Sequence, residues 1–388
     1  MIASKLARDQ LQRNASQLGF SLFGIVQAQP SPGFDRLIEW LKRGYAGTMS
    51  YIQKRSSAYE HPNSVLAGCK SVVMLAMPYA PNPSTMPSKA ILFDEQECGS
   101  IETVVKFEAE SRLGNYASGQ CDYHDLLRHR LNQLSSLLES MYPGSKNRGV
   151  VDTAPLMERD FAQMAGLGWI GKNTLLLNRE LGSYMFLAAL LTDVELAADD
   201  PFTADHCGTC TACLDVCPTS AFVAPRVLDA SRCISYLTIE YRGEIAPELS
   251  DQMADWIFGC DECQIVCPWN RKRQPEIAPE LKPIDMKTKT SLEHWLSMDE
   301  QTFRELYRKT PFWRTRLSGM QRNAMIAAGN TNRQDLRMHV ERFATSEDQV
   351  LVRTSIWCLS KLDGNKNPGS PRLSLADEAK FTEDSLPE

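Results

Sequence analysis

Eight of the twelve cysteines lie between residues 207 and 267, and their spacing limits what this part of the chain can fold around. The run from Cys207 to Pro218 has the form C-x2-C-x2-C-x3-C-P, the spacing that holds cubane iron–sulfur clusters in bacterial ferredoxins. A second copy ends in Cys260 to Pro268, and its first cysteine, Cys233, is displaced by an insertion. The sequence therefore predicts a module with two [4Fe–4S] clusters, which transfers electrons one at a time.

The same spacing predicts which cysteines share a cluster, because the last cysteine of each run binds the other cluster. The first cluster is expected to bind Cys207, Cys210, Cys213 and Cys267. The second is expected to bind Cys217, Cys233, Cys260 and Cys263. Zinc is an alternative, but it gives no reason for two C-x3-C-P ends. Disulfides are disfavoured because the start of the chain lacks the apolar core of a signal peptide.

Length and composition set the broad class. The chain has 388 residues, of which 43% are hydrophobic and 23% charged, as in a soluble protein with two or three domains. No apolar run is long enough to cross a bilayer, so we expect a cytoplasmic protein. The first residues predict an amphipathic helix with Leu6 and Leu11 facing inward.

The hydrophobic pattern divides the chain into segments with an α+β fold class overall. Residues 1–195 alternate between the apolar spacing of helices and that of strands, and they predict an α/β domain. Helices are expected over 34–42, 122–142 and 158–165, and strands over 21–26, 71–77, 149–151, 173–178 and 183–192, with a loop over 80–100. Residues 196–275 form the cluster module, which we expect to be held by metal instead of a hydrophobic core. Residues 276–362 predict helices similar to HEAT-type repeats, and residues 363–388 a disordered tail.

Charge is distributed unevenly. The net charge is −6, yet residues 271–322 carry a local excess of positive charge. Such a segment is typical of a site for an anionic partner such as a nucleic acid, although an ordinary solvated helical surface explains it equally well. Its basic residues are Arg271, Lys272, Arg273, Lys282, Lys287, Lys289, Arg304, Arg308, Lys309, Arg314, Arg316 and Arg322. Phe312 and Trp313 lie among them and could stack on a base or belong to the core.

The first half lacks a Walker A loop and a dinucleotide-binding glycine motif. Its main polar candidate is Asp152, which follows a predicted strand. An aspartate in that position can donate a proton in a cleft, or it can cap a turn. The residues alone leave both roles open.

Several segments together resemble the epoxyqueuosine reductase family, cobalamin-dependent enzymes that complete queuosine in tRNA. The matching segments are Asp122-Tyr-His124, Val151 to Pro155, Ala165 to Asn173, Arg232 to Glu240, Gly259 to Asn270 and Gln321 to Ala324. The resemblance extends from the first helix to about residue 362.

The resemblance implies that the chain reduces the epoxide of epoxyqueuosine at the wobble position of tRNA to the alkene of queuosine. The clusters would pass electrons to a base-off cobalamin in a nitroreductase-like domain, and Asp152 would protonate the departing oxygen. That role needs an aspartate whose pKa is raised, here by burial against the corrin. An external electron donor, no membrane and a monomeric protein are also expected.

Other residues are assigned by the same resemblance. Those matching positions at the cobalamin are Arg55, Asp152, Lys172, Asn173, Ser235 and Asp261, and Arg159 matches a position facing the tRNA. Asn115 stands where some relatives carry a cysteine able to approach the cobalt. A reductive dehalogenase-like cobalamin enzyme, a ferredoxin-like electron-transfer subunit and a pure tRNA-binding module are the alternatives.

Overall fold

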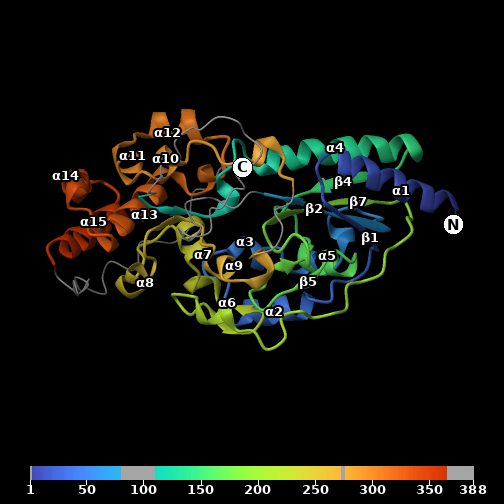
Figure 1. Cartoon of the computed structure of the whole chain (residues 1–388), viewed down its shortest axis with the longest axis horizontal. Coiled ribbons are helices and arrows are strands. Elements are labelled where there is room, and N and C mark those ends of the chain that lie inside the picture. The colour runs from blue at the N-terminus through green and yellow to red at the C-terminus, as the bar shows by residue number, and fades with distance from the viewer. Residues whose placement is uncertain (1, 80–109, 272–275, 365–388) are drawn as a thin grey trace, which may run out of the picture.

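The computed structural model of the chain describes residues 2–79, 110–271 and 276–364 (Figure 1). The loop predicted over 80–100 lies outside the described residues, as do Lys272, Arg273 and all of the predicted tail beyond Gly364. Within the described residues, no helix combines the length and apolar character needed to cross a membrane. Helices and strands are mixed, which confirms the predicted α+β class.

A four-stranded sheet organises the first half. Its strands, in spatial order, are β1 Leu22–Gln27, β2 Ser71–Pro78, β7 Met185–Thr192 and β4 Asn147–Val150. All neighbouring strands run antiparallel, and the register places Val73 of β2 opposite Leu190 of β7. Every residue of β2 is buried, because helices cover both faces of the sheet and strand side chains alternate between the faces.

The two faces of the sheet have separate cores. The helices of this half are α1 Ile2–Gln17, α2 Phe34–Lys42, α3 Ser50–Lys54, α4 Tyr123–Met141 and α5 Glu158–Met164. Helices α1 and α4 pack on the face that carries Val73 and Leu190. Helix α5 packs on the opposite face, where Met74 and Leu191 point (Figure 1). The predictions for α2, α4 and α5 are confirmed to within a residue or two.

Two expectations for this half are wrong. Leu6 is 63% exposed, because the buried stripe of α1 follows the helical spacing of Ala7, Leu11 and Ala15. The strand expected over 173–178 shrinks to β6 Leu176–Leu177, which pairs with β5 Trp169–Ile170. A tight turn replaces the missing part: Thr174 donates its N–H to the carbonyl of Gly171 at 2.9 Å and has a φ of 68°.

The cysteine-rich segment consists of short elements. They are α6 Ala212–Asp215, β8 Phe222–Ala224, β9 Val227–Leu228, α7 Ile234–Ile239, α8 Pro247–Gln252, β10 Trp256–Phe258 and α9 Glu262–Ile265. Strand β10 pairs in parallel with β3 Arg112–Leu113. Contrary to expectation, much of this segment has an apolar core. Residues Ile234 to Phe258 bury side chains in one continuous core with the helices that follow.

The last described part is helical, as predicted. It contains α10 Met286–Thr290, α11 Leu292–Ser297, α12 Glu300–Tyr307, α13 Arg316–Asn330, α14 Arg337–Glu341 and α15 Gln349–Leu362. Phe312 is fully buried in the core, whereas Trp313 is partly buried and stacks on Phe303 with ring centroids 5.7 Å apart. Arg322 is 1% exposed, so its expected place in a basic site for an anionic partner is wrong.

Candidate active site and cysteine groups

Four thiols from the two cysteine runs lie near enough to influence one another electrostatically, and we call Cys207, Cys210, Cys213 and Cys267 the first cysteine group. Burial, together with the nearby thiols of Cys267, Cys207 and Cys210, raises the pKa of Cys213 to about 11. Cys207 and Cys267 also pack in one small apolar cluster with Trp169 and Trp269. Cys267 thus lies with the first run although it ends the second.

The remaining thiols form a second cysteine group, defined as Cys217, Cys233, Cys260 and Cys263. Burial raises the pKa of Cys263, and Cys260 and Cys233 add to the effect. Cys217 in turn raises the pKa of Cys233. Cys213 also acts on Cys263, so the two groups are neighbours. None of the eleven cysteines in the described ranges forms a disulfide.

The turn after β5 connects to both groups. The Nζ of Lys172 donates to the carbonyls of Gly208 and Cys210, at 2.7 and 2.9 Å. The Nδ2 of buried Asn173 donates to the carbonyl of Cys263 at 3.4 Å. These side chains, assigned by resemblance to the cobalamin, therefore hold the backbone of the two cysteine loops. Ser235 lies near Cys233 at the start of α7 and is partly exposed.

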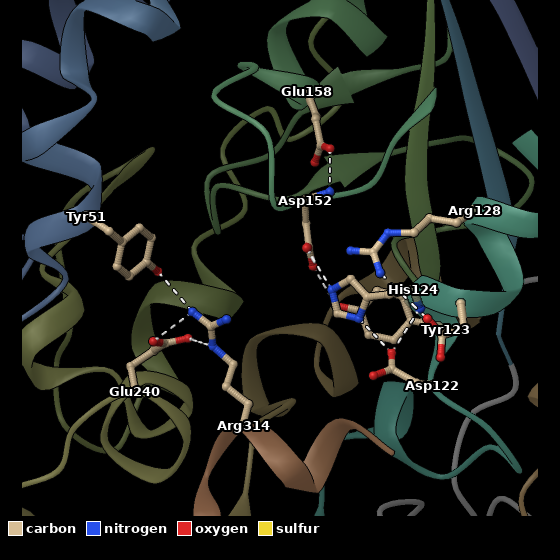
Figure 2. A network of polar contacts seen from close by, with 10 residues as sticks. Tyr51, Asp122, Tyr123, His124, Arg128, Asp152, Glu158, Glu240 and Arg314 are labelled. Carbon is tan, nitrogen blue, oxygen red and sulfur yellow. Dashed lines mark hydrogen bonds and ion pairs between the residues drawn. The ribbon is translucent and has the colours of Figure 1, made fainter. Parts of the chain in front are cut away.

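Asp152 is the centre of a compact hydrogen-bond network (Figure 2). Its Oδ1 lies 2.7 Å from Nε2 of His124, and its Oδ2 accepts a 2.6 Å hydrogen bond from the hydroxyl of Tyr123. The other imidazole nitrogen, Nδ1, lies 2.6 Å from Oδ1 of Asp122. Together with Glu158, these residues are called the Asp152 network. Asp152 remains 45% exposed, so it can reach a bound molecule.

Local structure explains why these side chains meet. Asp122 is the N-cap of α4, and its side chain accepts the backbone N–H of His124. His124 lies in the first turn of the helix, so its imidazole is beside the Asp122 carboxylate. The ring of Tyr123 stacks between His124 and Phe186, with centroids 4.0 and 4.1 Å away. The network therefore rests on the rigid end of a helix and on strand β7.

The backbone at Asp152 adopts a left-handed conformation with a φ of 38°, which is unfavourable for a residue with a side chain. Glu158 stabilises it, because its Oε1 accepts the N–H of Asp152 at 2.7 Å. Burial, together with the charge of Asp152, raises the pKa of Glu158 to about 8. Glu158 therefore holds the loop while staying largely neutral at pH 7.

His124 carries the clearest electrostatic signal in the network. Burial opposes its charge, but hydrogen bonds and charges from Asp122 and Asp152 together raise its pKa to about 9. Burial and Asp152 also raise the pKa of Tyr123, which keeps that hydroxyl protonated as a donor. At neutral pH the network thus places an imidazolium, a phenol and a largely neutral Glu158 around Asp152.

A second polar cluster faces the Asp152 network (Figure 2). Arg314 pairs with Glu240 through Nε and through Nη2, the latter at 3.0 Å, and its Nη2 lies 3.4 Å from the hydroxyl of Tyr51. Arg314 also responds to the charge of Asp152. Side chains from α3, from the residue after α7 and from the C-terminal helical part therefore border the same space as Asp152.

Tyr116 connects the Asp152 network to the second cysteine group. Burial raises its pKa, and Asp261, Glu240 and Asp152 all contribute to the increase. Its ring lies edge-on to Tyr123, with centroids 6.2 Å apart, and 5.8 Å from that of Phe258. Asp261 directly follows Cys260, so Tyr116 lies between the Asp152 network and the second cysteine group.

Comparison with known proteins gives this geometry a context. A family model described as "Epoxyqueuosine reductase QueG, DUF1730" matches residues 60–153, and one described as "4Fe-4S double cluster binding domain" matches residues 206–270. The epoxyqueuosine reductase of Pseudomonas aeruginosa is 38% identical over 81% of this chain and 82% of that protein. The Escherichia coli K12 epoxyqueuosine reductase is 33% identical over 90% of this chain and 88% of that protein. This chain belongs to the epoxyqueuosine reductase family.

Solved structures of epoxyqueuosine reductases have the same fold. One contains an epoxyqueuosine-modified stem loop of tRNA-Tyr, with 28% identity, a TM-score of 0.79, and coverage of 92% of this chain and 91% of that one. Another, from Bacillus subtilis, has its catalytic aspartate loop swung out of the active site. It has 28% identity, a TM-score of 0.80, and the same coverage.

The two arginines assigned from the epoxyqueuosine reductase family lie at the edge of the Asp152 network. The charges of Arg55 and Glu158 both affect the pKa of Tyr59, so all three side chains lie near one another. Arg55, exposed at the end of α3, is therefore close to the Asp152 network. Arg159 is exposed and donates to the carbonyl of Thr174 at 2.7 Å. It therefore joins α5 to the turn that carries Lys172.

Sequence reasoning missed the partners of Asp152. Asp122, Tyr123 and His124 entered only as a motif of the epoxyqueuosine reductase family. The usable signal was an N-cap aspartate two residues before a histidine, because such an aspartate can accept both from the helix and from the imidazole. Glu158 belongs to the same polar stretch of sequence as Asp152, but its contact with the Asp152 backbone depends on the conformation of the loop over residues 152–157.

Proposed function

We propose that this protein reduces the epoxide of epoxyqueuosine at the wobble position of tRNA to the alkene of queuosine. The reaction consumes two electrons and two protons and releases water. The observation that carries the proposal is that the two family models include the functional residues: residues 60–153 contain Asp152, and residues 206–270 contain all eight cysteines. Relatives with this activity in their names match over four-fifths or more of the chain.

The two cysteine groups would each hold one [4Fe–4S] cluster. The proximity of Cys213 to Cys263 supports direct electron transfer between them. The second group would be the exit, because Asp261 and Tyr116 connect it to the Asp152 network. An external reductant is needed to supply the electrons.

The family implies a base-off cobalamin, and the residues around the Asp152 network fit one. Both ring nitrogens of His124 are engaged by aspartates, so this imidazole would serve the acid at Asp152 and not bind a metal. Arg55 and Ser235 present exposed or partly exposed polar groups that would hold the corrin side chains. The cofactor would be supported indirectly by three side chains that hold the cysteine loops in place: Lys172, Asn173 and Asp261. When bound, cobalamin supplies the low-valent cobalt that reduces the epoxide carbon.

Asp152 would be the proton donor. Opening an epoxide leaves charge on oxygen, and a positioned acid removes that charge as it develops. The hydrogen bonds from Tyr123 and His124 fix the carboxyl group, and its 45% exposure leaves it accessible to substrate. The predicted burial against the corrin would follow only once the cofactor and the wobble nucleotide cover it.

The tRNA would be bound by exposed basic side chains, because neutralising phosphates provides affinity for RNA. The exposed candidates are Arg159, Arg271, Arg304, Arg308, Lys309, Arg314 and Arg316. The stem-loop complex of a related reductase supports a tRNA substrate. Replacing Arg304 and Arg308 together by alanine should weaken stem-loop binding and reduce its salt dependence, whereas an unchanged salt dependence would exclude these two side chains.

Finer features of the organisation are also proposals. We assign residues 1–195 to a nitroreductase-like cobalamin domain, residues 196–275 to the double-cluster module and residues 276–362 to HEAT-like helices that bind tRNA. We further propose that the protein works as a monomer in the cytoplasm.

The test is single-turnover conversion of an epoxyqueuosine-containing stem loop by anaerobically reconstituted protein. Asp152→Asn should decrease the rate by about 10²-fold or more, while iron content and cobalamin binding stay unchanged. The matched control is Asp125→Asn on α4, a carboxylate that is 68% exposed and pairs only loosely with Arg128. An Asp152→Asn protein as fast as the control would contradict the role of this residue.

The alternatives make different predictions for the same preparation. A ferredoxin-like electron carrier would hold iron but bind no cobalamin. A dehalogenase-like enzyme would release halide from halogenated phenols and leave the tRNA epoxide intact. A pure tRNA-binding module would bind the stem loop without turnover.

A further inference from the structure

The imidazole of His124 lies between two carboxylates, one at each ring nitrogen. Nδ1 lies 2.6 Å from Asp122 and Nε2 lies 2.7 Å from Asp152. A neutral imidazole carries one N–H and would turn a lone pair toward one of the carboxylates. Two short contacts with ionised carboxylates therefore require that both nitrogens be protonated. The alternative arrangement is a neutral imidazole beside one protonated aspartate. It differs from the first only in that one proton has moved from a ring nitrogen to the carboxylate oxygen it contacts.

The reaction under Proposed function needs more protons than one carboxyl group holds. Converting an epoxide to an alkene takes up two protons, one when each carbon–oxygen bond breaks, and the oxygen leaves as water. Asp152 can carry only one proton at a time. It must therefore be protonated again within each turnover, in a site that bound tRNA would cover.

We propose that His124 is the positioning residue that protonates Asp152, and that Asp122 keeps this imidazole charged. This inference rests on the proposed epoxide reduction and deepens it. In each of two passes, the Nε2 proton of His124 moves to Oδ1 of the Asp152 carboxylate, and the carboxyl group so formed delivers one proton to the substrate oxygen and returns to a carboxylate. His124, 21% exposed, regains a proton from solvent. Two electrons from the clusters balance the two protons.

The surroundings of His124 favour this role. The groups that face it or its two aspartates are Tyr123 and Arg128 on α4, Glu158 on α5, Tyr116 after β3, and Arg314 from the C-terminal part. Glu158 is largely neutral at pH 7 and both tyrosines remain protonated. Asp122 and Asp152 are therefore the groups that most stabilise the charge on His124. Tyr123 donates to Oδ2 of Asp152, which leaves Oδ1 as the oxygen that exchanges a proton with His124.

The first experiment measures protonation without any turnover. The protein is labelled with 15N-histidine, reconstituted with iron and sulfide, and titrated by NMR in the absence of cobalamin; the His124→Gln spectrum assigns the signal. His124 should remain an imidazolium up to about pH 9, and Asp122→Asn should lower its midpoint by at least one pH unit. A neutral His124 at pH 7 would overturn the inference.

The second experiment measures the pH profile of single-turnover epoxide reduction. His124→Gln should be slower by roughly tenfold at pH 6, with a gap that widens toward pH 8, because solvent must then protonate Asp152. Asp122→Asn, which retains the imidazole, should shift the alkaline limb of the profile to lower pH. The control is His129→Gln, an exposed histidine five residues along the same helix. Iron content and circular dichroism exclude misfolding.

The outcomes separate this inference from the proposed function. If the wild-type protein leaves the epoxide intact, the proposed function fails. If the wild-type protein converts it and His124→Gln has the same rate and pH profile, the role of His124 alone is wrong. A purely structural role would predict a uniform decrease in rate without any change in the pH profile.

Discussion

The backbone N–H of Asn115 donates a 2.6 Å hydrogen bond to Oδ2 of Asp261, a carboxylate that is only 2% exposed. The second oxygen, Oδ1, accepts a hydrogen bond from Nε2 of Gln264 at 2.9 Å. Asp261 lies in the loop between Cys260 and Cys263, whereas Asn115 follows β3, 146 residues earlier in the chain. This carboxylate therefore couples the position of the second cysteine group to the segment that leads into the Asp152 network.

Replacing Asp261 by asparagine should decrease stability, because both oxygens of Asp261 face donors. The new amide would turn its own NH2 group toward one of them and leave buried donors unsatisfied. We expect a loss of about 1–3 kcal/mol in the free energy of unfolding, measured by anaerobic urea denaturation of the reconstituted protein. The control is Asp251→Asn, whose side chain is 39% exposed. Equal losses in the two variants would contradict a special role for the Asp261 contacts.

The composition of the cysteine groups predicts an unusual pattern of iron loss. Cys267→Ser should remove about half of the iron, and Cys213→Ser should remove the same half, because both thiols belong to the first group. The double variant Cys213→Ser with Cys267→Ser should therefore lose no more than either single variant. Combining Cys267→Ser with Cys263→Ser should instead remove both clusters.

Iron and sulfide analysis with electron paramagnetic resonance of the reduced proteins would check this pattern. If Cys263→Ser and Cys267→Ser removed the same cluster, the exchange of the last cysteines between runs would be wrong. Serine retains the size of cysteine but is a weaker ligand, so the fold should change little.

The sequence predicted the features that depend on local spacing. Helical and strand patterns located α2, α4 and β2, since a continuous apolar run bounded by Pro78 indicates a buried strand. Leu6 was misplaced because neighbouring apolar residues on a helix lie about 100° apart, and only one row can face the core. The pairing of β5 with β6, and the shared core of residues 234–258 with the last helices, depend on long-range contacts that no local pattern encodes.

The same limit applies to the site. Asp152 was found from its position after a strand and from the family resemblance. Its partners Tyr123 and His124 come from another element, 28 or 29 residues away. Arg322 was misassigned because charge in a sequence indicates a basic side chain and not its exposure.

Arg322 should be a stability residue. Its guanidinium donates to the carbonyls of Leu237, Tyr241 and Gly243 at 2.6, 2.8 and 3.0 Å, and joins the cysteine-rich segment to α13. Arg322→Ala should cost on the order of 3 kcal/mol or more, because buried acceptors lose their charged donor. Arg304→Ala, at an exposed position of α12, should cost less than about 0.5 kcal/mol. Chemical denaturation compares them, and a stable Arg322→Ala protein with weakened tRNA binding would restore the phosphate-binding role.

Glu158 predicts a pH-dependent stability. Its pKa is raised to about 8 in the folded protein, chiefly by burial, and is near 4.5 when unfolded. The folded state therefore holds a proton that the unfolded state has lost between these values. The contribution of Glu158 to stability is complete below about pH 4.5 and disappears as the pH rises through 8.

Glu158→Gln should remove this dependence, because glutamine cannot ionise yet keeps an Oε1 that accepts the N–H of Asp152. Relative to the wild type, the variant should gain stability between pH 5 and pH 8.5, by roughly 1 kcal/mol once solvent screening is considered. Glu158→Ala should instead lose the hydrogen bond that supports the left-handed backbone at Asp152 and be destabilised at every pH. Thermal unfolding at several pH values separates the two effects. A Glu158→Gln protein that loses stability in parallel with the wild type as the pH rises would mean that the carboxylate, not the neutral acid, is the form that holds the Asp152 loop.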